Sequence, residues 1–469
     1  MEETKSKKLP LGLKLGYGSA EGGLTSSTNL IYFFLMFFLT DVAGINPALA
    51  GTVLMLATIV DGVTGPVIGV ISDNLKWKWG RRRPFMLIGA LPFGLALWLM
   101  FTDFQLGLGS FAYFVAMAAL FFIFFGMVNV PYSALGAEIT QDYNERTSLV
   151  SFRSGWSLVL TLFSVAMPLI LIEYIAEVYG SERIGWSILG AIIGAASVLM
   201  ILLTWRTTRG YELPSEAKSE AFKLKDIISM IQKNRSFRYT IGIWTAGIIA
   251  YNIATGNVVY FMTYVMGYDE TKAGMVFLGL ILCSLLWVPV IDYVTQKMGK
   301  RKAFIIFAGS WALMSAVSGI FITGPAFEWL FLLSAGTGLA VGTIMVYQIG
   351  WAMIPDITEV DELVSGRRRE GLIFSITTFI QKVASGVTLQ IVGLVLAWAG
   401  YIPDAVQTQG ALLGIRMVTY EGPVLFIILG MIFAYYLPLT SEKFQQLREV
   451  LRLKKENKEY DISTINDLM

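Results

Sequence analysis

The chain has 469 residues, of which 55% are hydrophobic and 15% charged, and its mean hydropathy is +0.62. Soluble domains carry about a quarter charged residues, so this balance indicates a protein whose main solvent is lipid. The formal net charge is only +2, and no basic tract with interleaved aromatic residues occurs, which argues against a nucleic-acid partner.

Two reactive residue types are almost missing from the sequence. Histidine is absent and Cys283 is the single cysteine, so no internal disulfide can form. The lack of histidine removes Ser/His and Cys/His nucleophile pairs, the commonest zinc ligand and the usual proton shuttle. We therefore predict that the protein is not an enzyme and has no cofactor. Residues 1–14 mix both charges, which predicts a cytoplasmic tail rather than a signal peptide.

Long apolar runs dominate the rest of the chain. About 20 apolar residues cross the hydrocarbon core as a helix, the one open-ended element that satisfies its backbone in lipid. The runs lie near 16–40, 47–72, 84–102, 108–134, 149–172 and 184–205, and then near 239–265, 273–296, 302–323, 327–351, 372–400 and 418–438. The predicted fold is all-α, with twelve transmembrane helices. The predicted regions are two six-helix halves (1–205 and 239–438), a central loop (206–238) and a tail (439–469).

The basic residues between the runs predict the orientation. One set of short loops is rich in lysine and arginine, which marks the cytoplasmic side. It contains Lys76, Lys78, Arg81, Arg82, Arg83, Lys297, Lys300, Arg301, Lys302, Arg367, Arg368 and Arg369. The opposite loops hold only Arg183, Lys272 and Arg416. We expect both termini to be cytoplasmic. The tail is amphipathic, which leaves open a place on the membrane surface, on the inner loops or in water.

The two halves repeat one another where the loops meet the spans. Asp73 and the Gly80–Phe85 segment match Asp292 and the Gly299–Phe304 segment, and Glu138-Ile139-Thr140 matches Asp356-Ile357-Thr358. Both matches have nearly the same offset along the chain, so one duplication explains them. Parallel six-helix repeats are typical of the major facilitator fold, whose substrate site lies between the halves near mid-membrane. Paired acids and bases at the inner helix ends predict a gate, formed by Asp73, Arg81, Arg82, Arg83, Asp292, Arg301, Glu138 and Asp356.

Several longer segments resemble one family within this fold. They are Thr40–Ile45, Gly51–Asp73, Trp79–Phe85, Pro355–Glu362 and Gly400–Arg416. Together they resemble the glycoside–pentoside–hexuronide:cation symporters, the group of the melibiose permease. The resemblance implies uptake of a sugar or glycoside driven by Na⁺ or H⁺. It implies a cation site on spans two and four beside a sugar site on spans one, four, five, ten and eleven.

The cation site implied by this resemblance is altered here. Asp61 lies in the middle of a span, where a charge is costly and usually functional, and it matches the family's first cation-binding acid. Gly65 and Asn129 stand where the family has two further acids. Thr64 and Asn129 still offer oxygens, and Glu21 is a further acid within the first span. These residues leave open a Na⁺ ion at Asp61, a proton on Asp61, or no coupling.

The sugar site implied by the resemblance is also altered. Its candidates match polar or aromatic family positions, or lie beside them: Thr25, Asn29, Tyr132, Arg153, Tyr347, Thr377, Thr378 and Lys382. Lys382 needs a carboxylate or an anionic substrate as its partner, and Asp61 is the natural one. Having fewer acids than the family makes the pocket more positive, which favours an acidic sugar such as a hexuronide.

The leading hypothesis is a symporter that imports a sugar, glycoside or sugar acid with H⁺ or Na⁺ by alternating access. One alternative keeps the fold but makes the protein an uncoupled facilitator or a transporter of lipids and other amphiphiles. Another makes it a membrane sensor that binds but does not transport. We expect a monomer in the cell membrane, whose partners are the lipid bilayer and a small-molecule substrate.

Overall fold

The structure is a computed structural model that describes residues 8–468, apart from 75–76, 78–79, 141, 212–229, 233, 345–348, 367–368, 404, 457, 460 and 464. Every regular element in this part of the chain is helical. Eleven helices within it are long and apolar enough to cross a membrane. The predicted all-α membrane fold is therefore confirmed, although the count is eleven rather than twelve. The predicted first span is helical too, but it is not among the eleven.

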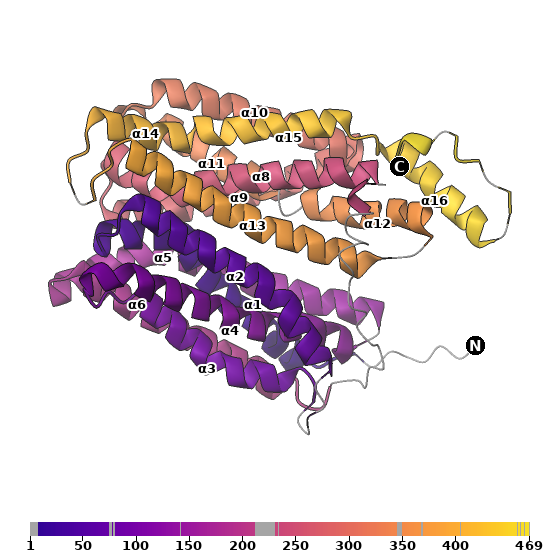
Figure 1. Cartoon of the computed structure of the whole chain (residues 1–469), viewed down its shortest axis with the longest axis horizontal. Helices are drawn as coiled ribbons and strands as arrows, with labels where there is room; N and C mark the ends of the chain where they lie inside the picture. Colours follow the sequence, from indigo (N-terminus) through magenta and orange to yellow (C-terminus); the bar gives the residue numbers. More distant parts are fainter. Residues whose placement is uncertain are drawn as a thin grey trace. The chain divides into compact units, whose positions relative to one another are not determined.

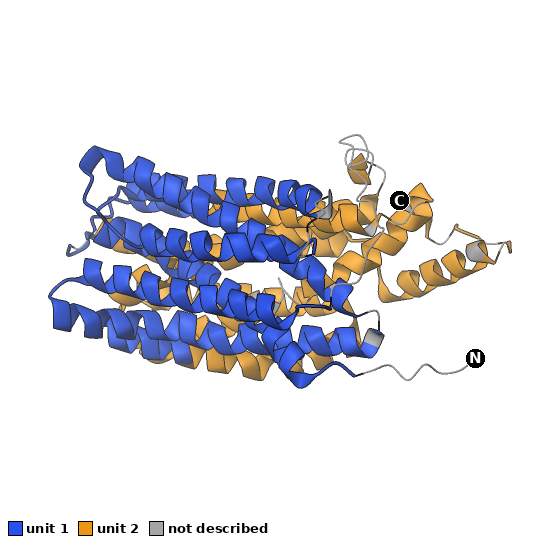
Figure 2. Cartoon of the chain, turned by 90° about the horizontal axis from the view of Figure 1, so that it is seen from below, with its two compact units in different colours: residues 1–220, 268–278, 389–408 blue, residues 221–267, 279–388, 409–469 orange. Residues whose placement is uncertain are grey.

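The chain forms two compact units, shown in different colours in Figure 2. The first comprises residues 1–220, 268–278 and 389–408, and the second comprises residues 221–267, 279–388 and 409–469. Two long helices, α9 (Glu270–Met298) and α13 (Glu370–Trp398), contribute one end to each unit. The division into halves 1–205 and 239–438, a loop 206–238 and a tail 439–469 follows the sequence rather than these units, and it stays a prediction. Two short segments of the second sequence half belong to the first unit.

The first unit is a bundle of helices (Figure 1). They are α1 (Leu11–Leu30), η1 (Ile31–Leu35), η2 (Phe38–Val42), α2 (Pro47–Asn74), α3 (Arg83–Met100), η3 (Gly107–Gly109), α4 (Ser110–Ile139), α5 (Tyr143–Tyr179) and α6 (Glu182–Thr207). Helix α1 packs against α5 and α6, whereas α3 packs against α4 and α6. Asp142 begins α5 by accepting a hydrogen bond from the amide of Glu145 (2.8 Å), and Gly180 ends it in a left-handed conformation.

The second unit contains the remaining helices, together with parts of α9 and α13. They are α8 (Arg235–Tyr260), η4 (Phe261–Val265), α10 (Lys300–Phe321), η5 (Pro325–Phe327), α11 (Glu328–Ile344), α12 (Trp351–Ser365), α14 (Gln409–Thr419), α15 (Glu421–Tyr436), α16 (Ser441–Lys455) and η7 (Asn466–Leu468). The tail helix α16 packs on α12. Its Leu447, Val450 and Leu451 are buried in the same apolar core as Phe304 and Trp311. The tail therefore docks on the second unit, as one of the three sequence alternatives proposed.

The internal repeat extends to local helix geometry. A five-residue π-helical stretch, η2 in the first unit and η4 in the second, follows the first long helix of each sequence half. Each stretch is followed two residues later by a glycine with positive φ, Gly44 (68°) and Gly267 (65°). The duplication read from the loops is thus repeated in backbone conformation.

Candidate functional site

A row of polar side chains joins α1 to α5 in the first unit. Arg153 donates from Nη2 (2.6 Å) and Nε (2.9 Å) to Glu21 Oε2. Thr25 and Ser157 share a hydrogen bond of 3.1 Å. Asn29 Nδ2 donates to Thr161 and Ser164, each at 3.1 Å. Successive α1 members are four residues apart and therefore share one helix face. We call this row of residues the α1–α5 ladder.

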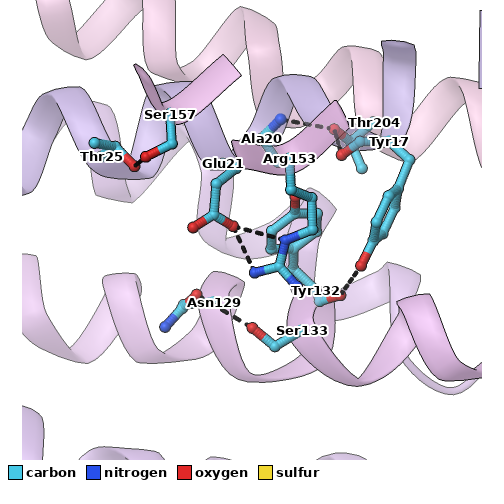
Figure 3. A network of polar contacts seen from close by, with 10 residues as sticks. All are labelled: Tyr17, Ala20, Glu21, Thr25, Asn129, Tyr132, Ser133, Arg153, Ser157 and Thr204. Carbon is cyan, nitrogen blue, oxygen red and sulfur yellow. Dashed lines mark hydrogen bonds and ion pairs between the residues drawn. The ribbon is translucent and has the colours of Figure 1, made fainter. Parts of the chain in front are cut away.

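Tyrosine side chains support the charged step of the ladder (Figure 3). The Arg153 guanidinium lies over the ring of Tyr132, 4.8 Å from its centroid, in a cation–π contact. Tyr17 packs against Tyr132 with ring centroids 5.1 Å apart, and both rings are buried. The side chains of Arg153 and Glu21 are 23% and 26% exposed, so neither is fully enclosed by protein. The ring face of Tyr132, a predicted sugar-site residue, is covered by Arg153 in this arrangement.

The predicted cation residues lie on α2 and α4 of the same unit. Asp61 is 3% exposed, and Thr64 Oγ1 donates to the carbonyl of Val60 at 2.7 Å. A Cβ at Gly126 would lie 2.8 Å from the Thr64 methyl, so α4 approaches α2 closely one turn before Asn129. Asn129 Oδ1 accepts a hydrogen bond of 3.5 Å from Ser133 (Figure 3). The structure thus brings Thr64 and the Asn129 turn together beside the turn that carries Asp61.

Asp61 belongs to no cluster of candidate metal ligands among the residues that the structure describes. No group of three or more cysteine, aspartate or glutamate residues among those described could hold a metal ion. Pro66, inside α2, has no N–H, so the carbonyl of Gly62 lacks its helical donor. The residue that follows Asp61 therefore has a carbonyl oxygen without its helical donor. A Na⁺ ion at Asp61 stays a prediction.

The second unit contains the other predicted sugar residues. Thr377 and Thr378 on α13 donate to backbone carbonyls one turn earlier, at 2.8 and 2.9 Å. Thr377 is buried and Lys382 is partly buried. Tyr347 lies outside the described residues. Asp61 and Lys382 belong to different units, and their predicted pairing stays a prediction.

Ion pairs join the predicted gate residues of the first unit. Glu138 Oε1 accepts from Arg81 Nη2 (2.5 Å) and Arg82 Nε (3.0 Å). Arg83 donates to the carbonyl of Trp205 from Nη2 (2.7 Å) and Nε (3.1 Å). The side chain of Asp73 is outside the description, so its predicted pairing with these arginines is neither supported nor opposed. The bonds of Arg81 and Arg82 to Glu138 bring together two bases and one acid of the predicted gate, whose gating role stays a prediction.

The equivalent pair in the second unit joins Lys300 and Asp356, at 2.7 Å. Lys300 and Asp356 occupy the positions of Arg81 and Glu138 in the sequence repeat. Burial raises the pKa of Asp356, and the hydrogen bond from Lys300 opposes that rise. The other predicted members differ, because Arg301 donates to the carbonyl of Tyr435 and the exposed Asp292 accepts from Gln296.

Three features of the sites were missed in the sequence. Asn252 on α8 donates to Ser385 on α13 at 2.7 Å, and both residues are buried. Asp361 is fully buried and accepts two hydrogen bonds from Arg369 (2.6 and 2.9 Å). Trp351 packs edge-on against Trp244. An amide in an apolar span was a readable signal for Asn252, whereas nothing local distinguishes Trp351 from other span aromatics.

Residues 16–441 match the sequence profile described as MFS/sugar transport protein. The chain belongs to this family. It is 30% identical to a protein named uncharacterized symporter sll1374 of Synechocystis sp., over 97% of this chain and 99% of that protein. The resemblance in the sequence to cation symporters is therefore confirmed at the family level.

Two other relatives carry substrate names. The chain is 26% identical to the isoprimeverose transporter of Lactiplantibacillus pentosus, over 87% of this chain and 85% of that protein. It is also 26% identical to a glucuronide carrier protein homolog of Escherichia coli, over 92% of this chain and 94% of that protein. Among solved structures, the nucleoside transporter NupG is similar in fold, with a TM-score of 0.63 at 13% identity, over 91% of this chain and all (100%) of that one.

Proposed function

We propose that this protein is a symporter that imports a sugar, glycoside or sugar acid with a cation by alternating access. The family supports this proposal, and so do relatives named as a glucuronide carrier homolog and an isoprimeverose transporter. The α1–α5 ladder is the observation that carries it. Hydroxyl, amide and charged groups in one row inside a membrane helix bundle suit a ligand with many hydroxyl groups.

A sugar acid is the substrate class that the charged step of the ladder favours. Arg153 presents a guanidinium fork, which binds a carboxylate through two parallel hydrogen bonds. In this arrangement both donating nitrogens bind one oxygen of Glu21. A substrate carboxylate can replace that oxygen, whereas a neutral sugar leaves the pair of charges in place.

A proton is the coupling ion that the residues around Asp61 favour. A sodium site needs several oxygen ligands and usually more than one negative charge. Gly65 and Asn129 supply no charge at the positions where the family has acids, and Asp61 is buried. A buried carboxylate can bind and release a proton without further ligands.

The proposed location is the cell membrane, with both termini in the cytoplasm. The eleven apolar helices support a membrane location, and the lysine and arginine asymmetry of the loops supports the orientation. On this orientation the ion pairs of Glu138 and Asp356 lie on the cytoplasmic side.

Uptake into proteoliposomes tests this function. Labelled neutral sugars, uronides and an amphiphile would be offered under an imposed proton gradient, an imposed sodium gradient or neither. We expect uronide accumulation that follows the proton gradient. Accumulation that follows sodium alone would contradict the coupling proposal, and equilibration without accumulation would indicate a facilitator. Binding without uptake would indicate a sensor, and uptake of the amphiphile alone would contradict the sugar proposal.

The variant Asp61→Asn tests the coupling residue. It removes the proton-binding group and keeps the size of the side chain. We expect gradient-driven accumulation to be lost while exchange of labelled for unlabelled substrate continues. Thr58→Val, which replaces a hydroxyl bonded within the same helix, is the matched control and should retain accumulation. Accumulation that survives Asp61→Asn would show that another residue carries the coupling.

A further inference from the structure

A cavity of about 440 Å³ lies in the first unit, where α2, α4 and α6 begin. Its lining comes from residues 43–49 at the turn into α2, from residues 103–111 at the turn into α4, and from Arg183 in the first turn of α6. The apolar spans of these helices begin at Pro47, Gly107 and Glu182. The cavity therefore lies at the surface of the membrane, at the level of the lipid headgroups. On the proposed orientation this is the outer surface.

The protein holds one edge of the Arg183 guanidinium. Its Nε donates to the carbonyl of Val42 at 3.1 Å and lies 3.4 Å from Asp103 Oδ2. Among the residues that the structure describes, none accepts a hydrogen bond from the two terminal nitrogens of Arg183. The side chain is 44% exposed. The guanidinium fork, which binds a phosphate through two parallel hydrogen bonds, is therefore available at the cavity.

Asp103 positions this arginine and is itself out of reach of a ligand. Its side chain is only 3% exposed. Oδ1 accepts a hydrogen bond from the amide of Gln105 at 2.9 Å, and Oδ2 faces Arg183 Nε. Gln105 has a positive φ of 54°, which is costly for a residue other than glycine, so this bond fixes the loop. Because the carboxylate is enclosed, the charge that the cavity offers to a ligand is the positive charge of Arg183.

Apolar side chains lie beside this charge. Leu49 and Leu108 line the cavity and are both exposed. Trp98, near the end of α3, donates from its indole nitrogen to Ser187, one turn after Arg183, at 3.1 Å. An exposed tryptophan with a polar partner at the end of a span is typical of the membrane–water interface. The cavity therefore suits an occupant with an anionic group at Arg183 and an apolar part against the leucines.

We propose that this cavity binds the phosphate group of a phospholipid through Arg183, with an acyl chain beside Leu49 and Leu108. A lipid is the occupant that the position favours, because the leucines are exposed where the membrane spans begin. Arg183 also holds the carbonyl of Val42, the last residue of η2, so a bound phosphate fixes this end of the first unit. The site goes beyond the proposed function, because it requires no transported substrate.

Photocrosslinking of the purified protein tests the site. The probe is a phosphatidylglycerol with a photoreactive group at the glycerol end of one acyl chain, added to the protein in a nonionic detergent, and the crosslinked peptides are mapped. We expect saturable crosslinks within residues 103–111. Arg183→Met should raise the probe concentration for half-maximal crosslinking about tenfold or more, because it removes charge-assisted hydrogen bonds. Unchanged crosslinking in this variant would overturn the proposal.

Two further variants separate phosphate binding from a packing role. Asp103→Asn removes the negative charge beside Arg183 and keeps an oxygen for the amide of Gln105, so it should lower the half-maximal concentration about threefold. A packing role alone predicts weaker crosslinking in this variant, which would contradict the proposal. Arg416→Met is the matched control, since this arginine binds the Gly319 carbonyl in the second unit (2.8 Å) and should leave the crosslinks unchanged. An equal loss in the control would also contradict it.

Competitors identify the source of the bound group. Unlabelled phosphatidylglycerol should displace the probe. At the same concentration, dioleoylglycerol, which has acyl chains and no phosphate, should not displace it, and neither should inorganic phosphate or glucuronate. Displacement by dioleoylglycerol would show an apolar groove, by inorganic phosphate a site for the free anion, and by glucuronate a site for a sugar acid, and each result would overturn the lipid proposal. The assay measures no uptake, so a failure of sugar transport would contradict the proposed function without affecting this result.

Discussion

The two sequence halves differ where their first helices meet the helices that carry the predicted sugar residues. In the first half, α1 and α5 share two ion pairs, Arg153–Glu21 and Lys14–Glu145, together with the hydrogen bonds of Thr25 and Asn29. In the second half, the corresponding contact of α8 with α13 includes an amide–hydroxyl bond from Asn252 to Ser385. Asn252 takes the place of Asn29 in the repeat, and at the same offset Trp244 takes the place of Glu21.

Aromatic rings replace the charges in the second half. Trp244 packs edge-on against Trp351, with centroids 4.6 Å apart, and Trp351 stacks on Phe374 at 5.8 Å. The difference shows how a duplicated scaffold has specialised. The first half carries charged, hydroxyl and amide groups at this contact, to which the proposed function assigns substrate binding, whereas the second half carries flat apolar rings.

The largest expected effect comes from breaking the charged step of the ladder. Arg153→Ala should lower uronide uptake by about 10- to 100-fold, since it removes a charge-assisted hydrogen bond worth about 1.5–3 kcal/mol. It should also reduce stability by about 1–3 kcal/mol, less than for a fully buried pair because both side chains are about a quarter exposed. Uptake rates and thermal unfolding in detergent measure the two effects.

The control for this prediction is a second ion pair between the same helices. Lys14 lies 2.8 Å from Glu145, and both side chains are largely buried. Lys14→Met should cost similar stability and leave the substrate affinity unchanged. A parallel loss of affinity in both variants would show that Arg153 acts through α1–α5 packing alone.

The repeat-related ion pairs at the helix ends should differ in strength. Glu138 is bound by two arginines and its side chain is 10% exposed, whereas Lys300, which binds Asp356, is 36% exposed. Glu138→Gln should therefore cost about 2 kcal/mol of stability, and Asp356→Asn about 0.5–1 kcal/mol. Thermal unfolding compares them directly, and equal costs would show that the second arginine adds nothing.

The paired asparagines test the same asymmetry with neutral groups. Asn29→Leu removes two hydrogen bonds and should cost about 1–2 kcal/mol. Asn252→Leu removes one and should cost about 0.6 kcal/mol, the average for such bonds in membranes. Only Asn29→Leu should also raise the KM for uptake. A larger KM change with Asn252→Leu would indicate that the main sugar contacts lie in the second half.

The smallest expected effect is a pH dependence from Asp356. Burial raises the pKa of this carboxyl above its ordinary value of 3.8, so folding favours its protonated form. Its contribution to stability is therefore full at low pH and is lost as the pH rises through the pKa of the folded state. Unfolding temperatures measured from about pH 4 upwards should show a decline that is weaker in Asp356→Asn. Identical profiles would exclude this residue as the source.

The sequence by itself determined that lipid is the main solvent of this chain, that its long apolar runs are helices and that its two halves arose by duplication. Apolar runs of membrane length predicted the long helices from α2 onward, because lipid leaves helix as the available backbone solution, but α5 (Tyr143–Tyr179) extends well beyond its predicted run of 149–172 at both ends. Asp61 could be selected because the position of a charge within an apolar span is costly and visible, whereas Arg153 was selected from the family resemblance. The repeat offset also paired Glu138 with Asp356 before either contact was known.

Only the tertiary structure decided which side chains meet. Glu21 and Arg153 are 132 residues apart, and local periodicity places each on a helix face but not against each other. The same holds for Arg82, whose contact with Glu138 depends on how α3 crosses α4. The segments around Gly274 and Tyr401 belong to the second half by sequence and to the first unit by packing. Backbone contact at a helix crossing depends on the neighbour as much as on the glycine, and one sequence pattern does not specify that neighbour.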